Sequence, residues 1–120
     1  MGKDIFTEKI FDAVAIAKSG SSLSRVIDLT GVDGYFSIQA TITGDGSAKF
    51  ELLLSNDGVD FIEPTSATDI ATGHTKTSGP GGDGKDIYRV LPPMVARFAK
   101  IRTTEAGVNG IVATITFASQ

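Results

Sequence analysis

Polar and apolar residues alternate along two neighbouring segments of the chain. In residues 36–43 the even positions are apolar and the odd positions polar, and apolar residues return at the even positions of 48–55. Successive side chains of a strand point to opposite faces, so this period of two suits a sheet with one buried and one solvated face. Gly44-Asp45-Gly46-Ser47 separates the two segments and has the composition of a tight turn. The pattern predicts an antiparallel hairpin and an all-β protein.

Further strands are indicated by shorter apolar runs between turn residues such as Gly, Ser, Asn, Asp and Pro. They are expected at about 11–17, 25–29, 61–62, 87–91, 95–103 and 111–117. Short strands at such regular spacing, separated by turns, are typical of sandwiches and jelly rolls. We therefore predict a single antiparallel β-sandwich of jelly-roll type with about eight strands. The alternation in 95–103 breaks near Phe98-Ala99, which indicates a β-bulge there.

The regular alternation also predicts which side chains form the core. They are the apolar positions of the best-patterned strands: Phe36, Ile38, Ile42, Phe50, Leu52, Leu54, Ile115 and Phe117. The same phase places Glu51 on the outer face of its strand, where a solvated carboxylate is expected.

The N-terminal segment does not fit this pattern. Phe6 and Ile10 share a helical face, but the region can also be interpreted as a strand, because short apolar runs do not separate the two periods. We interpret residues 1–12 as an extended N-terminal arm and 13–120 as the sandwich domain. The alternative is that these residues are simply the first strand or helix of that domain.

The polar, Gly-rich residues 65–86 are predicted to form a long loop inserted in the domain. Within it, Gly79–Asp86 matches the phosphate-binding pattern G-x-x-x-x-G-K, but Asp86 replaces the hydroxyl residue that would hold Mg²⁺. No strand is expected before this motif and no helix after it, so a flexible loop is predicted instead of a nucleotide site. His74, the only histidine, is expected to be a solvated residue of this loop.

Length and composition restrict the class of protein further. The chain has 120 residues, a formal net charge of −3 and no cysteine. One domain is therefore expected, without disulfides, thiolate zinc sites or a Cys nucleophile. The basic residues are scattered, which argues against nucleic-acid binding. No segment has the length and apolarity of a membrane helix, and the start lacks a signal-peptide pattern, so we expect a soluble protein without membrane partners.

Residues that carry chemistry occur without the spacing that the chemistry needs. Asn56–Asp60, with Glu63 and Asp69 nearby, offers oxygen ligands for Ca²⁺ but lacks the register of an EF-hand and has the composition of a turn. His74 has no G-x-S-x-G serine to act with, and one histidine does not form a metal site by itself. Carboxylates such as Glu51 come without any tryptophan to stack on a sugar. We predict no enzyme activity, no metal and no cofactor.

Two runs of residues resemble one known family. Residues 50–61, read as a strand and hairpin, and the run Ala96-Arg97-Phe98-Ala99-Lys100-Ile101-Arg102 are similar to signatures of discoidin-like, galactose-binding jelly rolls. Phe61 stands where that family usually has Trp. The resemblance implies a carbohydrate-binding module that uses apical loops, here around Asn56–Asp60 and His74.

A broader pattern resembles small β-sandwich proteins found in the structural gene sets of tailed phages and prophages. Its segments are 26–29, 34–39, 55–58, 77–81 and 100–105, followed by a strand at the C-terminus. This resemblance implies a virion component, such as a capsid decoration or a head- or tail-associated protein, made in the bacterial host cytoplasm. It implies no site residue.

Our leading hypothesis is a non-enzymatic phage structural protein that forms a homo-oligomer and contacts other virion proteins; the carbohydrate-binding module, with a glycan ligand, is the alternative. Large apolar side chains concentrated near the N-terminus need a burial site, and ordering a long loop costs about 1–2 kcal/mol per residue unless a neighbour compensates. The predicted subunit contacts are therefore Ile5, Phe6, Ile10 and Phe11 in the arm, and His74 and Lys76 in the loop.

Overall fold

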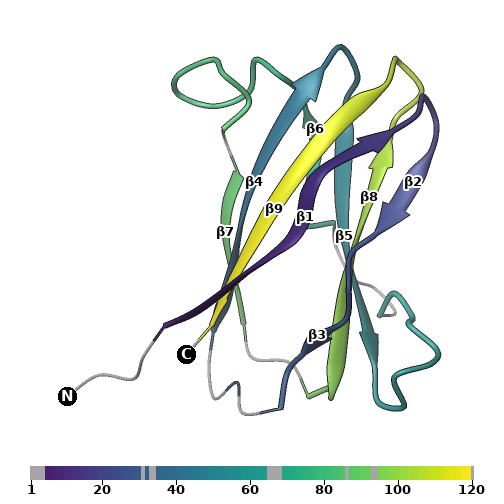
Figure 1. Cartoon of the computed structure of the whole chain (residues 1–120), viewed down its shortest axis with the longest axis vertical. Helices are drawn as coiled ribbons and strands as arrows, with labels where there is room; N and C mark the ends of the chain where they lie inside the picture. Colours follow the sequence, from purple (N-terminus) through teal and green to yellow (C-terminus); the bar gives the residue numbers. More distant parts are fainter. Residues whose placement is uncertain are drawn as a thin grey trace.

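The computed structural model describes residues 5–30, 32, 35–64, 69–85, 87–92 and 95–119, and in these residues every regular element is a β-strand. The strands are β1 (Phe6–Ile16), β2 (Ser21–Leu23), β3 (Ile27–Asp28), β4 (Phe36–Gly44), β5 (Ala48–Ser55), β6 (Ala71–His74), β7 (Ile87–Leu91), β8 (Phe98–Glu105) and β9 (Ile111–Ser119). They form two antiparallel sheets packed face to face (Figure 1). The predicted all-β sandwich is confirmed. None of the described residues forms a helix that could cross a membrane.

The two sheets interleave the early and late strands of the chain. One sheet has the order β1-β9-β4-β7, and the other has the order β2-β8-β5-β6, with β3 also paired to β8. The pairing is nested: β1 pairs with β9, β2 and β3 with β8, β4 with β7, and β5 with β6. Phe6 lies opposite Ser119, so β1 begins where β9 ends; we call this the terminal end of the sandwich. The opposite end, which carries the turns at 17–20, 45–47 and 106–110, is called the turn end.

The interpretation of residues 1–12 as an arm is wrong from Phe6 onward. Residues 6–9 pair in register with 116–119 of β9, and both Ile10 and Phe11 are buried. The strand was hard to recognise because register shifts fall between Lys9 and Phe11 and again before Val14, which breaks the period of two. Residues 1–4 lie outside the described residues.

Other strand predictions hold in part. Ser21–Leu23 forms β2 between two predicted strands, where no strand was predicted. Ala71–His74 forms β6 inside the predicted loop 65–86, of which 65–68 and 86 are not described. The short strand at 61–62 is a single bridge between Ile62 and Leu54. The predicted bulge at Phe98-Ala99 is absent, because β8 pairs with β5 in unbroken register.

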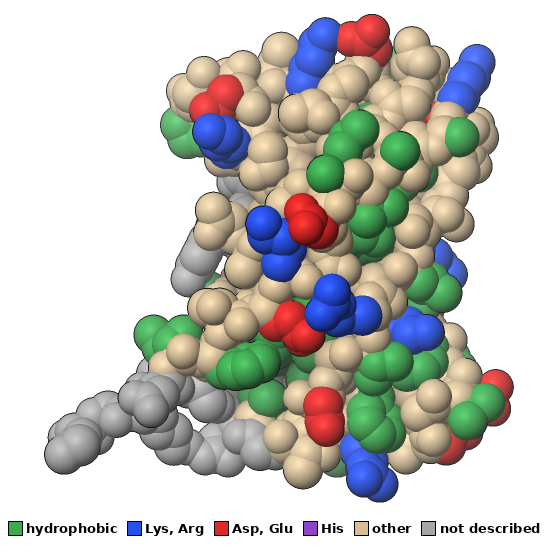
Figure 2. Space-filling model, in the orientation of Figure 1, with side chains coloured by type: hydrophobic (Ala, Val, Ile, Leu, Met, Phe, Trp, Pro, Cys, Tyr) green, Lys and Arg blue, Asp and Glu red, His purple; other side chains and the backbone are tan. Residues whose placement is uncertain are grey.

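The face of the molecule in Figure 2 carries mixed charges. Figure 2 shows acidic and basic side chains interspersed on the visible face, with no large area of one sign. This distribution agrees with the scattered basic residues of the sequence.

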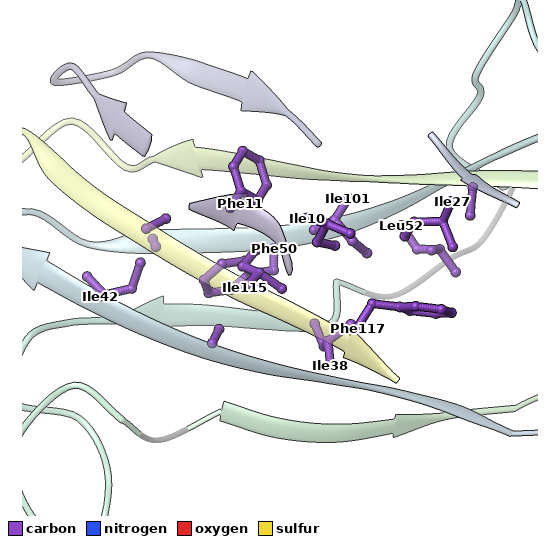
Figure 3. Close-up of a cluster of buried hydrophobic side chains, with 14 of the residues drawn as sticks. Ile10, Phe11, Ile27, Ile38, Ile42, Phe50, Leu52, Ile101, Ile115 and Phe117 are labelled. Atoms are coloured by element: carbon purple, nitrogen blue, oxygen red, sulfur yellow. The ribbon is translucent and has the colours of Figure 1, made fainter. Parts of the chain in front are cut away.

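The core lies between the two sheets and follows the predicted alternation. All the predicted core residues are buried except Leu54, which is partly buried. Side chains of both sheets point into the same space (Figure 3), and the rings of Phe36 and Phe117 lie 5.5 Å apart. Each fully buried side chain of this size contributes roughly 1.5–3 kcal/mol to the fold, which opposes the conformational entropy lost on folding.

Candidate interaction surface

Glu105, a buried carboxylate at the turn end, holds three turns together. Its position at the end of β8 continues the inward phase of Ala99, Ile101 and Thr103, and its residue is 2% exposed. Its oxygens accept hydrogen bonds of 2.6–3.1 Å from backbone N–H groups of Ser19, Ser47, Gly107 and Val108. Burial acts to raise the pKa of Glu105, but these hydrogen bonds outweigh it and lower the pKa to about 2. The group is therefore a fixed anion that joins the turns.

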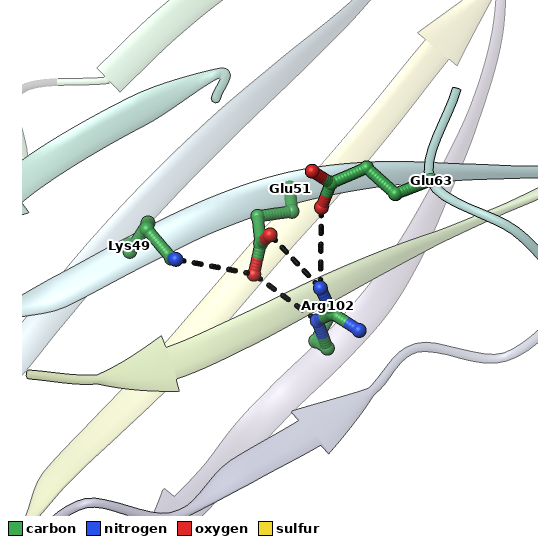
Figure 4. A network of polar contacts seen from close by, with 4 residues as sticks. All are labelled: Lys49, Glu51, Glu63 and Arg102. Carbon is green, nitrogen blue, oxygen red and sulfur yellow. Dashed lines mark hydrogen bonds and ion pairs between the residues drawn. The ribbon is translucent and has the colours of Figure 1, made fainter. Parts of the chain in front are cut away.

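Glu51 is the centre of a polar network on the outer face of the β5–β8 sheet (Figure 4). Arg102 donates from Nε and Nη2 to its two oxygens at 3.0 and 2.8 Å, and Lys49 Nζ lies 3.7 Å away. Arg102 Nη2 also donates to Glu63 at 3.2 Å. The bidentate contact with Arg102 lowers the pKa of Glu51 to about 2, whereas the hydrogen bond shared with Glu51 raises the pKa of Glu63.

The expectation that Glu51 is solvated is wrong, because its residue is only 5% exposed. The segment that follows the hairpin folds back over this face, placing Glu63 beside Arg102 and the ring of Phe61 4.4 Å from Lys100 Nζ. Carboxylate oxygens of Glu51, Glu63 and Asp69 lie within 4.8 Å of one another, but the guanidinium of Arg102 already supplies a positive charge to this cluster. The network therefore has a structural role: it joins β5, β8 and the segment that contains Glu63.

The turn at 56–60 uses its acidic residue to close the backbone. Asp57 Oδ1 accepts hydrogen bonds from Ser55 Oγ and from the N–H groups of Val59 and Asp60 at 2.8–2.9 Å, and Gly58 has a φ of 76°. These contacts, the Val59 N–H first, lower the pKa of Asp57. Turn chemistry accounts for the composition that also suggested Ca²⁺ ligands.

Within the predicted loop, Ala71–His74 forms β6, and residues 75–85 form hydrogen-bonded turns without regular secondary structure. His74 is 3% exposed, and its Nε2 lies 3.0 Å from the carbonyl oxygen of Gly84. The same oxygen accepts the N–H of Ile42 at 3.2 Å, so Gly84 links the two sheets. The strand β7 follows this segment, and no helix N-terminus is present in the described residues to bind a phosphate.

The carbohydrate-binding alternative needs Asn56–Asp60 and His74 to lie close together, and the structure separates them. His74 pairs with Ala48 at the start of β5, whereas residues 56–60 follow its last residue. A strand rises about 3.3 Å per residue, so the eight residues of β5 place these segments roughly 25 Å apart.

The predicted contact residues divide into exposed and buried groups. Ile5 and Phe6 are 66% and 60% exposed and remain available to a partner. Ile10, Phe11 and His74 belong to the interior, so those contact predictions are corrected. Lys76 is exposed, but it lies at the turn end and forms an ion pair with Asp45.

Most large apolar side chains that are exposed in the described residues lie at the terminal end. In Figure 2, hydrophobic side chains are visible over the lower part of the molecule, beside the start of β1 and also towards the right. The members at this end are Ile5, Phe6, Val26, Tyr35, Val59, Ile62, Val90 and Val95, whereas Leu23 and Val108 lie elsewhere. Exposed apolar surface concentrated in one region marks an interaction site more often than scattered single residues do.

Three clefts open at this end. A cleft of about 360 Å³ lies between Asn56, Asp60 and Val95. A second, of about 470 Å³, lies between β1 and β3 and includes Phe6, Glu8 and Asp28. A third, of about 200 Å³, is lined by residues that include Ile5, Tyr35, Ser37, Val90 and Ala118. The terminal end is therefore the candidate interaction surface.

Comparisons with known proteins show the fold but no family. No protein-family model and no curated protein sequence matches the chain. The crystal structure of the SPBc2 prophage-derived protein YomS superposes on 98% of this chain and 94% of its own, with a TM-score of 0.52 and 11% sequence identity. At this identity the likeness concerns the fold alone.

Two further solved structures are more distant. A chain from the disulfide-linked pili of Bacillus endospore appendages has a TM-score of 0.39 and 13% identity, with 100% of this chain and 91% of that chain covered. A chain from infectious bursal disease virus, Gx strain, has a TM-score of 0.40 and 10% identity, with 96% of this chain and 31% of that chain covered. These two likenesses are too weak to carry an argument.

Sequence reasoning missed the residues that define the surface apart from Ile5 and Phe6. Tyr35 and Val90 belong to segments 55 residues apart, and only the pairing of β4 with β7 brings their ends together. No local pattern contains that information. The inward position of Glu105, in contrast, follows from continuing the alternation of β8 by two residues.

Proposed function

We propose that this protein is a non-enzymatic structural subunit of a phage virion, a capsid decoration or a head- or tail-associated protein, that docks through its terminal end. The observation that carries the proposal is the concentration of exposed apolar side chains at that end. Such a surface suits a subunit that is held on a larger particle by burying one end.

The topology supports a virion role. The nested pairing of β1 with β9, β2 and β3 with β8, β4 with β7, and β5 with β6 is the wrapping expected of a jelly roll, an architecture used by viral capsid domains. The fold shared with a prophage-derived protein points to the same biological setting. The protein is then made in the host cytoplasm and incorporated into particles.

The state of the buried carboxylates supports a role without catalysis. Glu51 and Glu105 are both held as anions by hydrogen bonds to Arg102 or to the backbone. A general acid or base needs a pKa near the operating pH, and hydrogen bonds to the charged form move these two groups the other way.

The test is the composition of particles. Virions are purified from the strain that encodes the chain after prophage induction or infection, and the protein is measured by peptide mass spectrometry. We expect a fixed copy number per particle. A protein that is abundant in the lysate but absent from purified particles would overturn the proposal.

A binding assay with depleted particles examines the surface itself. Wild-type protein is expected to rebind, and Val95→Asp at the terminal end is expected to weaken rebinding. Val108→Asp, an equally simple change at an exposed residue of the turn end, is the matched control and should rebind normally. Equal rebinding of both variants would place the contact elsewhere.

A further inference from the structure

The third cleft differs from the other two in its charge. The first cleft includes Asp57 and Asp60 in its wall, and the second includes Glu8 and Asp28. None of the described residues that line the third cleft is charged. If two copies of the chain met through either of the first two clefts, carboxylates would face carboxylates, which is unfavourable. Of these three clefts, the third is the one whose described residues bring no like charges to a second copy.

Small side chains form the floor of this cleft, and larger ones surround it. The cleft lies on the outer face of the β1-β9-β4-β7 sheet, where Ser37 is paired with both Ala118 and Val90. The small side chains of Ser37 and Ala118 form a floor, and Ile5, Tyr35 and Val90 stand around it. A raised apolar rim beside a recess of about 200 Å³ is the kind of surface that two identical copies can fill reciprocally.

The available area fits a weak but specific contact. Ile5, Tyr35 and Val90 are 66%, 64% and 58% exposed. With the floor between them they offer on the order of 400–500 Å² per copy, much of it from one large aromatic ring. Two copies face to face would bury roughly 800–1,000 Å² in total, which is below the area of standard interfaces and in the range of weak, transient contacts.

We propose that the third cleft is a two-fold self-association site, in which Ile5, Tyr35 and Val90 of each copy pack against the Ser37–Ala118 floor of the other. This inference deepens the proposed function, because it names a second copy of the chain as the partner at one part of the terminal end. A dissociation constant in the range of about 10–100 µM is expected in solution. On a particle, many tethered copies would strengthen the contact through avidity.

Sedimentation velocity of the full chain, from about 5 to 500 µM, tests the proposal around this dissociation constant. Wild-type protein should shift reversibly from monomer to dimer. Val90→Asp places two carboxylates in the interface and should raise the dissociation constant at least tenfold. Ser37→Asp changes the floor and should act in the same way. Val108→Asp, at a residue 61% exposed and at the turn end, is the matched control and should dimerise as the wild type does.

A wild-type chain that stays monomeric over this range overturns the inference. The inference also fails if Val90→Asp and Ser37→Asp both dimerise as strongly as the wild type. Equal loss in Val108→Asp would also overturn it. Circular dichroism melting of each variant verifies that the fold is retained. A monomeric protein that is nevertheless found in purified virions would reject self-association and leave the proposed function standing, with another virion protein as the partner.

Discussion

The substitution Phe11→Ala tests whether β1 is a core strand or a detachable arm. Phe11 is 2% exposed, lies in β1 and belongs to the buried cluster between the sheets. Replacing a buried Phe by Ala removes its transfer free energy and leaves a cavity, at a cost of about 3–5 kcal/mol. Domains of this size are stable by only about 5–15 kcal/mol, so the variant loses a large share of its free energy of unfolding.

The matched control is Phe6→Ala in the same strand. Phe6 is 60% exposed, and its removal should change the free energy of unfolding by no more than about 0.5 kcal/mol. Urea unfolding followed by circular dichroism measures both variants, and the midpoint should fall for Phe11→Ala at an unchanged slope. In thermal melts, about 3–6 °C per kcal/mol is expected for this chain length, which gives a drop of roughly 10–30 °C.

Two results would refute the reasoning. One is a Phe11→Ala variant that melts within a few degrees of the wild type. The other is a Phe6→Ala variant that loses as much stability as Phe11→Ala. Deletion of residues 1–12 gives an independent answer, because removing more than half of β1 should unfold the domain, whereas removal of a detachable arm would leave a folded sandwich.

Three further predictions concern polar and backbone contacts. The contribution of Glu51 and Glu105 to the free energy of unfolding should be fully present above about pH 4.5, the usual carboxyl range, and should be lost as the pH falls towards 2, because both have a pKa of about 2 in the folded chain. Urea unfolding between pH 2 and 6 should show a weaker decline in Glu105→Gln than in the wild type. Arg102→Ala should cost about 1–3 kcal/mol, since it leaves Glu51 buried without its main partner, and a double-mutant cycle with Glu51→Gln measures the coupling. Gly84→Ala should lower the melting temperature more than Gly82→Ala. Both glycines have positive φ, but only at Gly84 does an added Cβ meet the Ile42 carbonyl oxygen, at 2.3 Å. Equal falls in melting temperature would show that the backbone strain of positive φ alone matters.

The alternating strands could be predicted because their signal is local. Residues 36–43 and 111–117 show the period of two, and the structure places them in β4 and β9 with the expected faces inward. The strand β1 was ambiguous because its bulges interrupt that period, and Ala13 has a φ of 51° within it. The strand β6 was missed because Ala-Thr-Gly-His contains no large apolar residue to reveal a face.

Burial of charged and polar groups could not be predicted in the same way. Glu51 occupies an outward position of β5, and Arg102 together with the returning residues 61–63 covers it. His74 is buried because Gly84, ten residues further on, approaches its ring. Both effects depend on contacts across the fold, where a sequence pattern carries no signal.

The nested pairing of the strands makes the terminal surface a property of the finished chain. The strand β9 lies between β1 and β4, so Ile5 and Tyr35 come to flank Ala118 only after the last strand has been inserted. A nascent or truncated chain without β9 lacks the floor of the third cleft. Such non-local pairing folds slowly, on a scale of about milliseconds to seconds. Self-association by this route would therefore select full-length, folded copies and exclude incomplete ones from a growing assembly.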